Sequence, residues 1–307
     1  MNPRLMLLDT ASLYFRAFYG VPDTVRSPDG VPVNAARGLL DIITKLVTVY
    51  EPTHIVACWD DDWRPQWRVD LVPSYKAHRV AEIVATGPDV EEVPDSLEAQ
   101  LPLIRDALAV VGIAVLGAPG YEADDVIGTL ASSAEIPVDI VTGDRDLFQL
   151  IDDVRDIRVI YTAKGMSHLE VMTEQTLRDK YGVTGAQYAD FATLRGDSSD
   201  GLPGVRGVGD KTAAALLSAH GDLAGVISEA DHGDALSPNL QAKIRDAAEY
   251  LAVAPQVVAV ARDVPLTVLD TALQSLTPEE MVDAERLASQ WGLGAAITRL
   301  TDALTRY

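Results

Sequence analysis

The first half of the chain alternates short apolar runs with longer amphipathic stretches. Residues 5–8, 55–59 and 138–141 are almost wholly apolar, and apolar runs this short are typical of strands buried in a parallel sheet. Residues 35–49 and 97–111 repeat apolar side chains every three or four positions, which predicts helices packed on one face. The alternation predicts an α/β fold over residues 1–178, with a central, mostly parallel sheet flanked by helices.

The second half of the chain carries few strand-like runs. A glycine-rich turn at 202–212 leads into an alanine-rich helix expected over 212–219. Such a turn presents backbone N–H groups at a helix start, where a phosphate can bind, although Gly-x-Gly turns also occur as plain connectors. We expect a helical unit over 179–275, and one or two amphipathic helices over 276–307 that pack on the core.

A long insertion separates the second strand from the next helix. Residues 61–95 show neither the short apolar runs of the strands nor the three-or-four-residue repeat of the helices. They combine tryptophan, arginine, lysine and proline with an acidic stretch. Long connections at the carboxyl edge of a sheet are usually functional or mobile. We therefore expect this insertion to border a site.

Each predicted strand runs into an aspartate. Asp9 follows the first strand directly, Asp60 the second, and Asp144 lies three residues beyond the third. In open α/β sheets the ligand crevice lies at the carboxyl ends of the strands. The three side chains are therefore expected to meet at one place.

Further carboxylates are clustered at 122–125, at 144 and 146, and at 197 and 200. Like charges this close raise each other's pKa unless cations hold them. Acidic runs such as 60–62 are more often solvated faces, but the strand-end positions favour a divalent-metal site. Oxygen donors without histidine or cysteine select Mg²⁺ or Mn²⁺ over Zn²⁺.

Composition limits the partners and the compartment. The net charge of −21, from 25 Lys+Arg against 46 Asp+Glu, predicts weak non-specific affinity for nucleic acid, but bound cations would offset part of it and basic residues can be grouped locally. No apolar run approaches a membrane span, and the start is unlike a signal peptide. We expect a cytoplasmic protein without membrane contact, in which the single cysteine, Cys58, is a buried thiol.

Several motifs in fixed order carry a family resemblance. They are Leu-Leu-Asp at 7–9, Tyr-Phe-Arg-Ala at 14–17, Pro-Gly-Tyr-Glu-Ala-Asp-Asp at 119–125, Thr-Gly-Asp-Arg-Asp-Leu at 142–147 and Gly-Asp-Ser-Ser-Asp-Gly-Leu-Pro-Gly-Val at 196–205. Over nearly its whole length the chain resembles the 5′-nuclease superfamily of flap endonucleases and 5′–3′ exonucleases. It is most similar to the bacterial exonuclease domain related to the amino-terminal part of DNA polymerase I, as a free-standing member or an excised domain.

The resemblance implies a PIN/FEN-like core with a helical arch at about 61–95 and a helix-hairpin-helix subdomain. It also implies two or more Mg²⁺ or Mn²⁺ ions that activate water and bind the scissile phosphate. One end of the metal site would be formed by Glu122, Asp124, Asp125, Asp144 and Asp146, with Asp9 and Asp60 in support. The other end would be formed by Asp197 and Asp200.

The resemblance also implies cationic and DNA-binding residues. Lys76 and Arg79 match the arch motif that stabilises charge on the scissile phosphate; the alternative is that they are unpartnered surface cations. The implied DNA contacts are Tyr14, Arg16, Arg64, Arg68, Tyr75, Gly204, Gly207, Gly209 and Lys211. Tyr14 and Arg16 could equally pack locally, and Trp63 and Trp67 are either core or base-stacking residues. The hairpin would hold K⁺ on carbonyls of about Val205 to Val208.

The activity implied is hydrolysis of DNA at 5′ ends and 5′-flap junctions during replication and repair, by a monomer working beside a polymerase and a ligase. RNA-containing 5′ strands are included among the substrates. Three alternatives remain: a DNA-structure-binding protein without catalysis, a PIN-like RNase, and a phosphatase built on Asp9 alone. The sequence does not separate exonuclease from flap endonuclease preference.

Overall fold

The fold is built on a six-stranded sheet. The computed structural model describes residues 2–84, 87–267 and 270–306. Its strands are arranged in the order β5 (Ala114–Leu116), β2 (His54–Cys58), β1 (Leu5–Asp9), β6 (Val138–Thr142), β7 (Ile157–Tyr161) and β8 (Glu170–Met172). The first five are parallel and β8 pairs antiparallel with β7. The three predicted strands are confirmed, and they are neighbours at the centre of the sheet.

The sheet separates two hydrophobic cores, because side chains alternate between its faces along each strand. Leu5 and Leu7 on β1 point into the core beneath α6 (Ala123–Ser133), whereas Met6 and Leu8 point into the core beneath α2 (Asn34–Tyr50). Both faces are covered, which explains why the central strands are apolar throughout.

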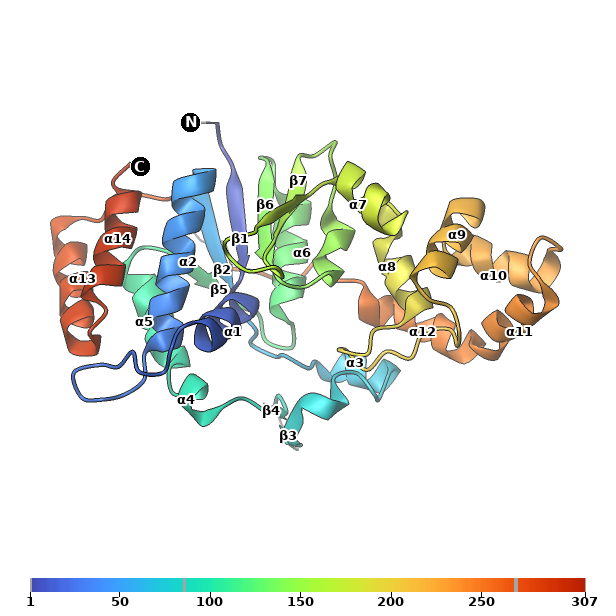
Figure 1. Ribbon diagram of the computed structural model, residues 1–307, viewed down its shortest axis with the longest axis horizontal. Coiled ribbons are helices and arrows are strands. Elements are labelled where there is room, and N and C mark those ends of the chain that lie inside the picture. Colours follow the sequence, from blue (N-terminus) through green and yellow to red (C-terminus); the bar gives the residue numbers. More distant parts are fainter. Residues whose placement is uncertain (1, 85–86, 268–269, 307) are drawn as a thin grey trace.

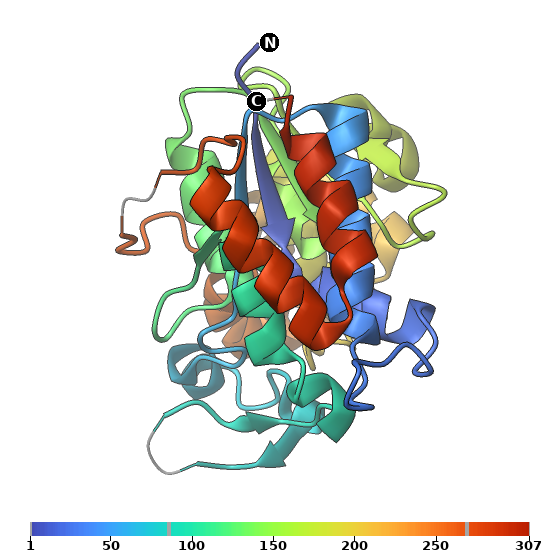
Figure 2. The same cartoon turned by 90° about the vertical axis from the view of Figure 1, so that its left-hand side faces the viewer.

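Helices α13 (Pro278–Trp291) and α14 (Gly294–Leu304) pack beside α2 and α5 (Leu101–Val110), as Figure 2 shows from that side. The helix expected over 97–111 is divided. A short α4 (Asp95–Glu98) precedes α5, whose first turn contains Pro102. Proline is tolerated in the first turn of a helix because its missing N–H has no partner there.

A helical unit extends from one edge of the sheet (Figure 1). It contains α7 (Glu174–Tyr181), α8 (Gly185–Arg195), α9 (Asp210–His220), α10 (Leu223–His232), α11 (Pro238–Asp246) and α12 (Ala248–Val258). Helix α8 packs against the turn η2 (Asp146–Leu150) of the core and against α9 and α12. Over the residues described, no helix combines the length and apolarity that crossing a bilayer requires.

The insertion at 61–95 differs from the expected helical arch. Its described residues form only a six-residue α3 (Gln66–Leu71), a 3₁₀ turn η1 (Ala77–Arg79) and a small hairpin of β3 (Val80–Glu82) and β4 (Val90–Glu91). Pro65, Pro73, Pro88 and Pro94 interrupt the segment, and proline within a helix removes a hydrogen bond and clashes with the preceding turn. The insertion passes beneath the ends of the central strands (Figure 1).

Candidate active site

A cleft of about 240 Å³ lies at the carboxyl edge of the sheet, where β1, β2 and β6 end. Its lining includes five of the predicted carboxylates and both predicted catalytic cations: Asp9, Asp60, Glu122, Asp124, Asp144, Lys76 and Arg79. The convergence predicted for the strand-end aspartates follows directly from the adjacency of their strands.

Local hydrogen bonds fix the carboxylates at the strand ends. Asp9 caps α1 (Thr10–Gly20) by accepting the Ser12 N–H at 3.1 Å, and it accepts the Thr142 hydroxyl at 2.6 Å. These bonds hold Asp9 between β1 and β6. Asp60 accepts the backbone N–H of Ala123 at 2.7 Å, so it is tied to the first turn of α6.

A second group of carboxylates lies beside Asp144. The N–H of Asp146 donates to Asp144 at 2.9 Å. Burial raises the pKa of the Asp146 carboxyl, and repulsion from Asp144, Asp200 and Asp197 raises it further. Asp197 is already bonded to Arg195 at 3.0 Å and to the N–H of Ser199 at 2.9 Å. One oxygen of Asp146, Oδ1, is buried without a hydrogen-bond partner.

Burial raises the pKa of most of these carboxyls. It raises the pKa of Asp9 and of Asp200 to about 6 and that of Asp60 to about 7. The pKa values of Asp124 and Asp146 lie well above the ordinary value, because burial is reinforced by neighbouring carboxylates. A cation beside these groups would favour their charged forms.

The donor set fits hard divalent cations. Every candidate ligand is a carboxylate, and Asp146 Oδ1 has a buried lone pair without a donor. Among the residues described, no three such side chains converge tightly enough to chelate one ion by themselves. This arrangement suits Mg²⁺, which keeps several waters and is held through one or two carboxylates together with substrate phosphate.

Lys76 lies in the wall of the cleft, buried against Glu122. Its Nζ pairs with Glu122 Oε2, and although burial lowers the pKa of the ammonium group, Glu122 raises it well above its usual value. Its backbone has φ +48°, which is uncommon for a residue with a side chain. Arg79 pairs with Glu91 and lies 5.3 Å from the centre of the Trp63 ring.

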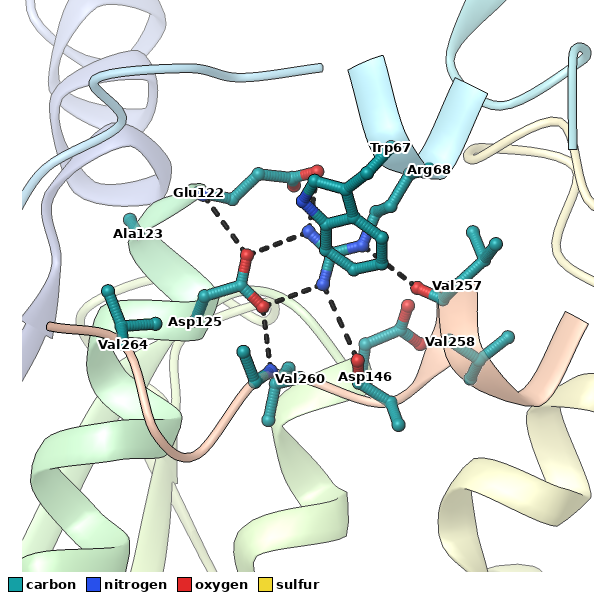
Figure 3. Close-up of polar contacts among 12 residues, drawn as sticks. Trp67, Arg68, Glu122, Ala123, Asp125, Asp146, Val257, Val258, Val260 and Val264 are labelled. Atoms are coloured by element: carbon teal, nitrogen blue, oxygen red, sulfur yellow. Dashed lines mark hydrogen bonds and ion pairs between the residues drawn. The ribbon is translucent and has the colours of Figure 1, made fainter. Parts of the chain in front are cut away.

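Asp125 is a correction to the predicted ligand set. Its side chain is fully buried and turned toward Arg68, whose fork donates to it at 2.7 and 2.8 Å; the N–H groups of Ala261 and Glu122 donate to it at 2.8 and 3.2 Å (Figure 3). With every site on both oxygens engaged by the fold, Asp125 is a structural carboxylate. Arg68, predicted as a DNA contact, is 2% exposed and its fork is occupied by Asp125.

Other predicted DNA contacts in the insertion are also interior. Arg64 donates to Asp89 at 2.5 Å and to the carbonyl of Tyr75 at 2.7 Å, and the Tyr75 hydroxyl donates to Glu122 at 2.7 Å. Tyr14, on α1 and outside the insertion, is also buried, with its ring centre 5.8 Å from that of Trp59. These three side chains brace the cleft wall instead of lining a path for DNA.

The two tryptophans of the insertion pack locally. Trp63 donates to the carbonyl of Asp89 at 2.7 Å, and Trp67 lies 4.4 Å over the guanidinium of Arg68. Sequence reasoning missed the residues that hold this wall and the carboxylates: Asp89, Glu91, Thr142 and Gln149. Only Thr142 carried a signal, since it is the first residue of the motif at 142–147.

Arg16 lines a second cavity that adjoins the cleft. This cavity, of about 820 Å³, is lined by Arg16, Tyr19 and Lys45 among others, and it shares Ser12 and Phe15 with the cleft. Arg16 Nε is buried without a hydrogen-bond partner. An unsatisfied guanidinium N–H beside the cleft suits a phosphate oxygen.

The glycine-rich turn has the backbone conformation expected of a tight hairpin. Gly204 has φ +64°, and a Cβ there would lie 2.4 Å from the backbone nitrogen of Gly196, so only glycine fits. Gly209 caps α9, and Gly207 and Lys211 are exposed. The turn borders a cavity of about 700 Å³ that Arg206 and Lys243 also line.

Two family descriptions cover most of the chain. "5′-3′ exonuclease, N-terminal resolvase-like domain" matches residues 4–182, and "5′-3′ exonuclease, C-terminal SAM fold" matches residues 183–282. The chain belongs to the 5′-3′ exonuclease family. Its division at 182/183 lies four residues beyond the boundary expected from sequence.

Members of this family are similar in sequence to the chain over nearly its whole length. The chain is 59% identical over 301 residues to a 5′-3′ exonuclease of Streptomyces coelicolor, covering 98% of this chain and 100% of that protein. It is 47% identical over 315 residues to a 5′-3′ exonuclease of Mycobacterium tuberculosis, covering 99% and 98%. DNA polymerase I of the same species is 38% identical over 312 residues, which are 99% of this chain and 32% of the polymerase.

Solved structures share the exonuclease fold at low identity. The T5 D15 protein co-crystallised with metal ions superposes with a TM-score of 0.65 at 16% identity, over 99% of this chain and 98% of that one. The catalytic core of Rad2 with DNA substrate gives 0.57 at 16%, over 98% and 92%. The predictions of the α/β fold and of a 5′–3′ exonuclease are confirmed.

Proposed function

We propose that this exonuclease is a divalent-metal-dependent, structure-specific nuclease that hydrolyses DNA at 5′ ends and 5′-flap junctions. The observation that carries the proposal is the convergence of Asp9, Asp60, Asp124 and Asp144 on one cleft whose wall holds a buried lysine. Such a cleft suits a phosphodiester, which brings negative charge that carboxylates alone would repel. Cations must therefore accompany it.

The carboxylates would bind those cations as two groups of ligands. Asp9, Asp60, Asp124 and Asp144 would hold them on one side of the scissile phosphate. Asp146, which the resemblance places with the first group, is also repelled by Asp197 and Asp200 and would act with them on the other side. Mg²⁺ or Mn²⁺ bound there would make an attacking water more acidic and neutralise charge on the phosphate. The free Oδ1 of Asp146 supports its role as a direct ligand.

Lys76 and Arg79 supply positive charge from the protein itself. Glu122 keeps Lys76 protonated and fixed, since its pKa is raised by that carboxylate. A preorganised cation needs little rearrangement as charge develops on the phosphate. Arg79 is more exposed and stays within the cleft lining, so it suits a contact to the same phosphate or its neighbour.

The duplex would be held away from the cleft, through its backbone. Amides of the turn at Gly204, Gly207 and Gly209, with Lys211, suit phosphates of the duplex, and Arg16 suits a phosphate beside the cleft. The same turn suits a K⁺ ion on carbonyls of about Val205 to Val208. A solved structure of similar fold, titled as a T5 D15 flap endonuclease complex with DNA and metal ions, supports DNA and metal ions as partners.

The cellular setting follows from the relatives. Similarity to the amino-terminal third of DNA polymerase I supports action beside a polymerase, and ligation would follow removal of a 5′ flap. We expect a cytoplasmic monomer that also accepts RNA-containing 5′ strands.

The test is cleavage of a 5′-flap duplex labelled at either end, compared with blunt duplex and single strand, with Mg²⁺, Mn²⁺ or chelator. Metal-dependent products at the junction or the 5′ end are expected. Binding of the flap without any cleavage in either metal would instead identify a DNA-structure-binding protein, and preferential cutting of single-stranded RNA would identify an RNase.

A further inference from the structure

Residues 257–261 form a strap that is bonded by the side chains of Arg68, Asp125 and Gln149. They comprise the last residues of α12 and the chain that leaves it; Ala259 is already extended, with ψ 128°. The last carbonyls of a helix have no partner within the helix. At this helix end the carbonyls are bonded by side chains from the nuclease core and its insertion.

Arg68 grips the strap from the insertion. Its Nε donates to the carbonyl of Val257 at 3.1 Å and its Nη2 to that of Ala259 at 3.4 Å, while the fork pairs with Asp125. Asp125 in turn accepts the N–H of Ala261 at 2.8 Å. A cation at a helix carboxyl end is favoured by the helix dipole. The first turn of α6 is thereby fastened to the strap (Figure 3).

Gln149 grips the same strap from η2. Its Nε2 donates to the carbonyl of Val258 at 3.1 Å and to that of Asp146 at 2.9 Å, and its Oε1 accepts the N–H of Val260 at 3.0 Å. Gln149 is 5% exposed. The turn that carries Asp146 is therefore fastened to Val258 and Val260. These two residues alternate along the strap with the three that Arg68 and Asp125 bind.

We infer that Arg68 and Gln149 are positioning residues that set the spacing of the two carboxylate groups through their common grip on the strap. Neither side chain lines the cleft. The inference rests on the proposed function, since the spacing matters only if cations occupy both groups. Displacing a catalytic group by about 1 Å can lower the rate about 100-fold. A change in the spacing of the two carboxylate groups is therefore expected to lower activity.

The test compares Gln149→Met with Gln100→Met. Gln100 is a matched control: it is 1% exposed and its side chain joins two helices, with bonds to Ala35 N–H at 2.9 Å and to Asn34 at 3.1 Å, outside the cleft. Both variants are expected to lower the melting temperature. Only Gln149→Met is expected to weaken Mn²⁺ binding, by about 10-fold in a calorimetric titration without DNA.

Arg68→Lys provides a second variant if Gln149→Met does not fold, because lysine keeps the charge beside Asp125 but cannot fork to the strap. It is expected to weaken Mn²⁺ binding and lower kcat, with KM for flap DNA unchanged. An unaltered Mn²⁺ titration in Arg68→Lys, or an equal shift in Gln100→Met, would overturn the inference. So would a wild-type protein that binds no Mn²⁺, whereas wild-type Mn²⁺ binding without DNA cleavage would overturn the proposed function alone.

Discussion

The backbone N–H of Lys76 donates to the carbonyl of Asp200 at 2.9 Å, so the buried cation of the insertion is anchored on the loop that carries the second group of carboxylates. At this anchor the two backbone segments approach so closely that no side chain fits at position 201. A Cβ on Gly201 would lie 2.1 Å from the carbonyl oxygen of Ser74. The position of Lys76 therefore depends on a glycine more than a hundred residues away in sequence.

Gly201→Ala is expected to push the Ser74 segment off this loop, displace Lys76 and lower kcat by about 10-fold or more. The clash is with backbone, which a rotamer change cannot relieve. Steady-state cleavage of a 5′ flap measures the effect. Gly30→Ala is the matched control, since Gly30 also has positive φ (+82°) but open space around it; it shares the backbone strain of about 1 kcal/mol and should retain activity. Equal activity in the two variants would contradict the anchor.

Lys76→Ala is expected to lower turnover by about 100-fold while changing the Kd for flap DNA by less than about 3-fold, because the ammonium group is buried and fixed where charge develops. Single-turnover cleavage and metal-free DNA binding separate the two effects. Lys180→Ala removes another lysine–glutamate pair, with Glu170, and should change neither. Equal losses in turnover and affinity would make Lys76 a plain affinity contact.

Asp146→Asn is expected to lower cleavage by about 100-fold or more and to raise the melting temperature of the metal-free protein. The carboxyl is buried beside like charges, with Oδ1 unpartnered and its pKa well above the usual range, so removing the charge relieves repulsion while removing a ligand. Calorimetry in chelator and a flap-cleavage assay test the two effects. Asp234→Asn, at an exposed carboxylate, should leave both unchanged; a melting temperature lowered by Asp146→Asn would count against the repulsion.

Stability of the metal-free protein is expected to fall between pH 4 and pH 7. The pKa of Asp60 rises from 3.8 to about 7 and that of Asp9 from 3.8 to about 6 on folding, so in this window the folded state holds protons that the unfolded state has released. The stabilisation that these bound protons give the folded state is complete below the pKa of the unfolded state. It is lost as the pH rises through the pKa of the folded state. Melting temperatures in chelator should fall over this range, Mg²⁺ should reduce the fall, and Asp60→Asn should flatten it. A rise with pH would contradict the assignment.

Lys211→Ala is expected to weaken duplex binding uniformly across sequences and to reduce the slope of log K against log salt by about one, because one phosphate contact is lost. Fluorescence anisotropy at several salt concentrations measures the slope. Arg286→Ala on α13 removes an exposed cation far along the chain from the glycine-rich turn and should leave the slope unchanged. Equal slopes for Lys211→Ala and the wild type would place the duplex elsewhere.

Local sequence was sufficient for the three central strands of the sheet and for part of the site. The apolar runs at 5–8, 55–59 and 138–141 became β1, β2 and β6, and α6 begins at Ala123, within the acidic cluster at 122–125. These features are encoded by neighbouring residues, through side-chain period and helix capping. The shared edge of parallel strands then brings Asp9, Asp60 and Asp144 together.

The sequence by itself thus determined the α/β class, the family and the carboxylates that line the cleft. Only the tertiary structure decided which charged residues hold one another. Arg68 and Asp125 are 57 residues apart, and Lys76 and Glu122 are 46 apart, so no local pattern distinguishes a buried pair from a ligand or a DNA contact. The role of a charged residue depends on which residue it contacts in the folded protein, and that contact depends on the tertiary structure.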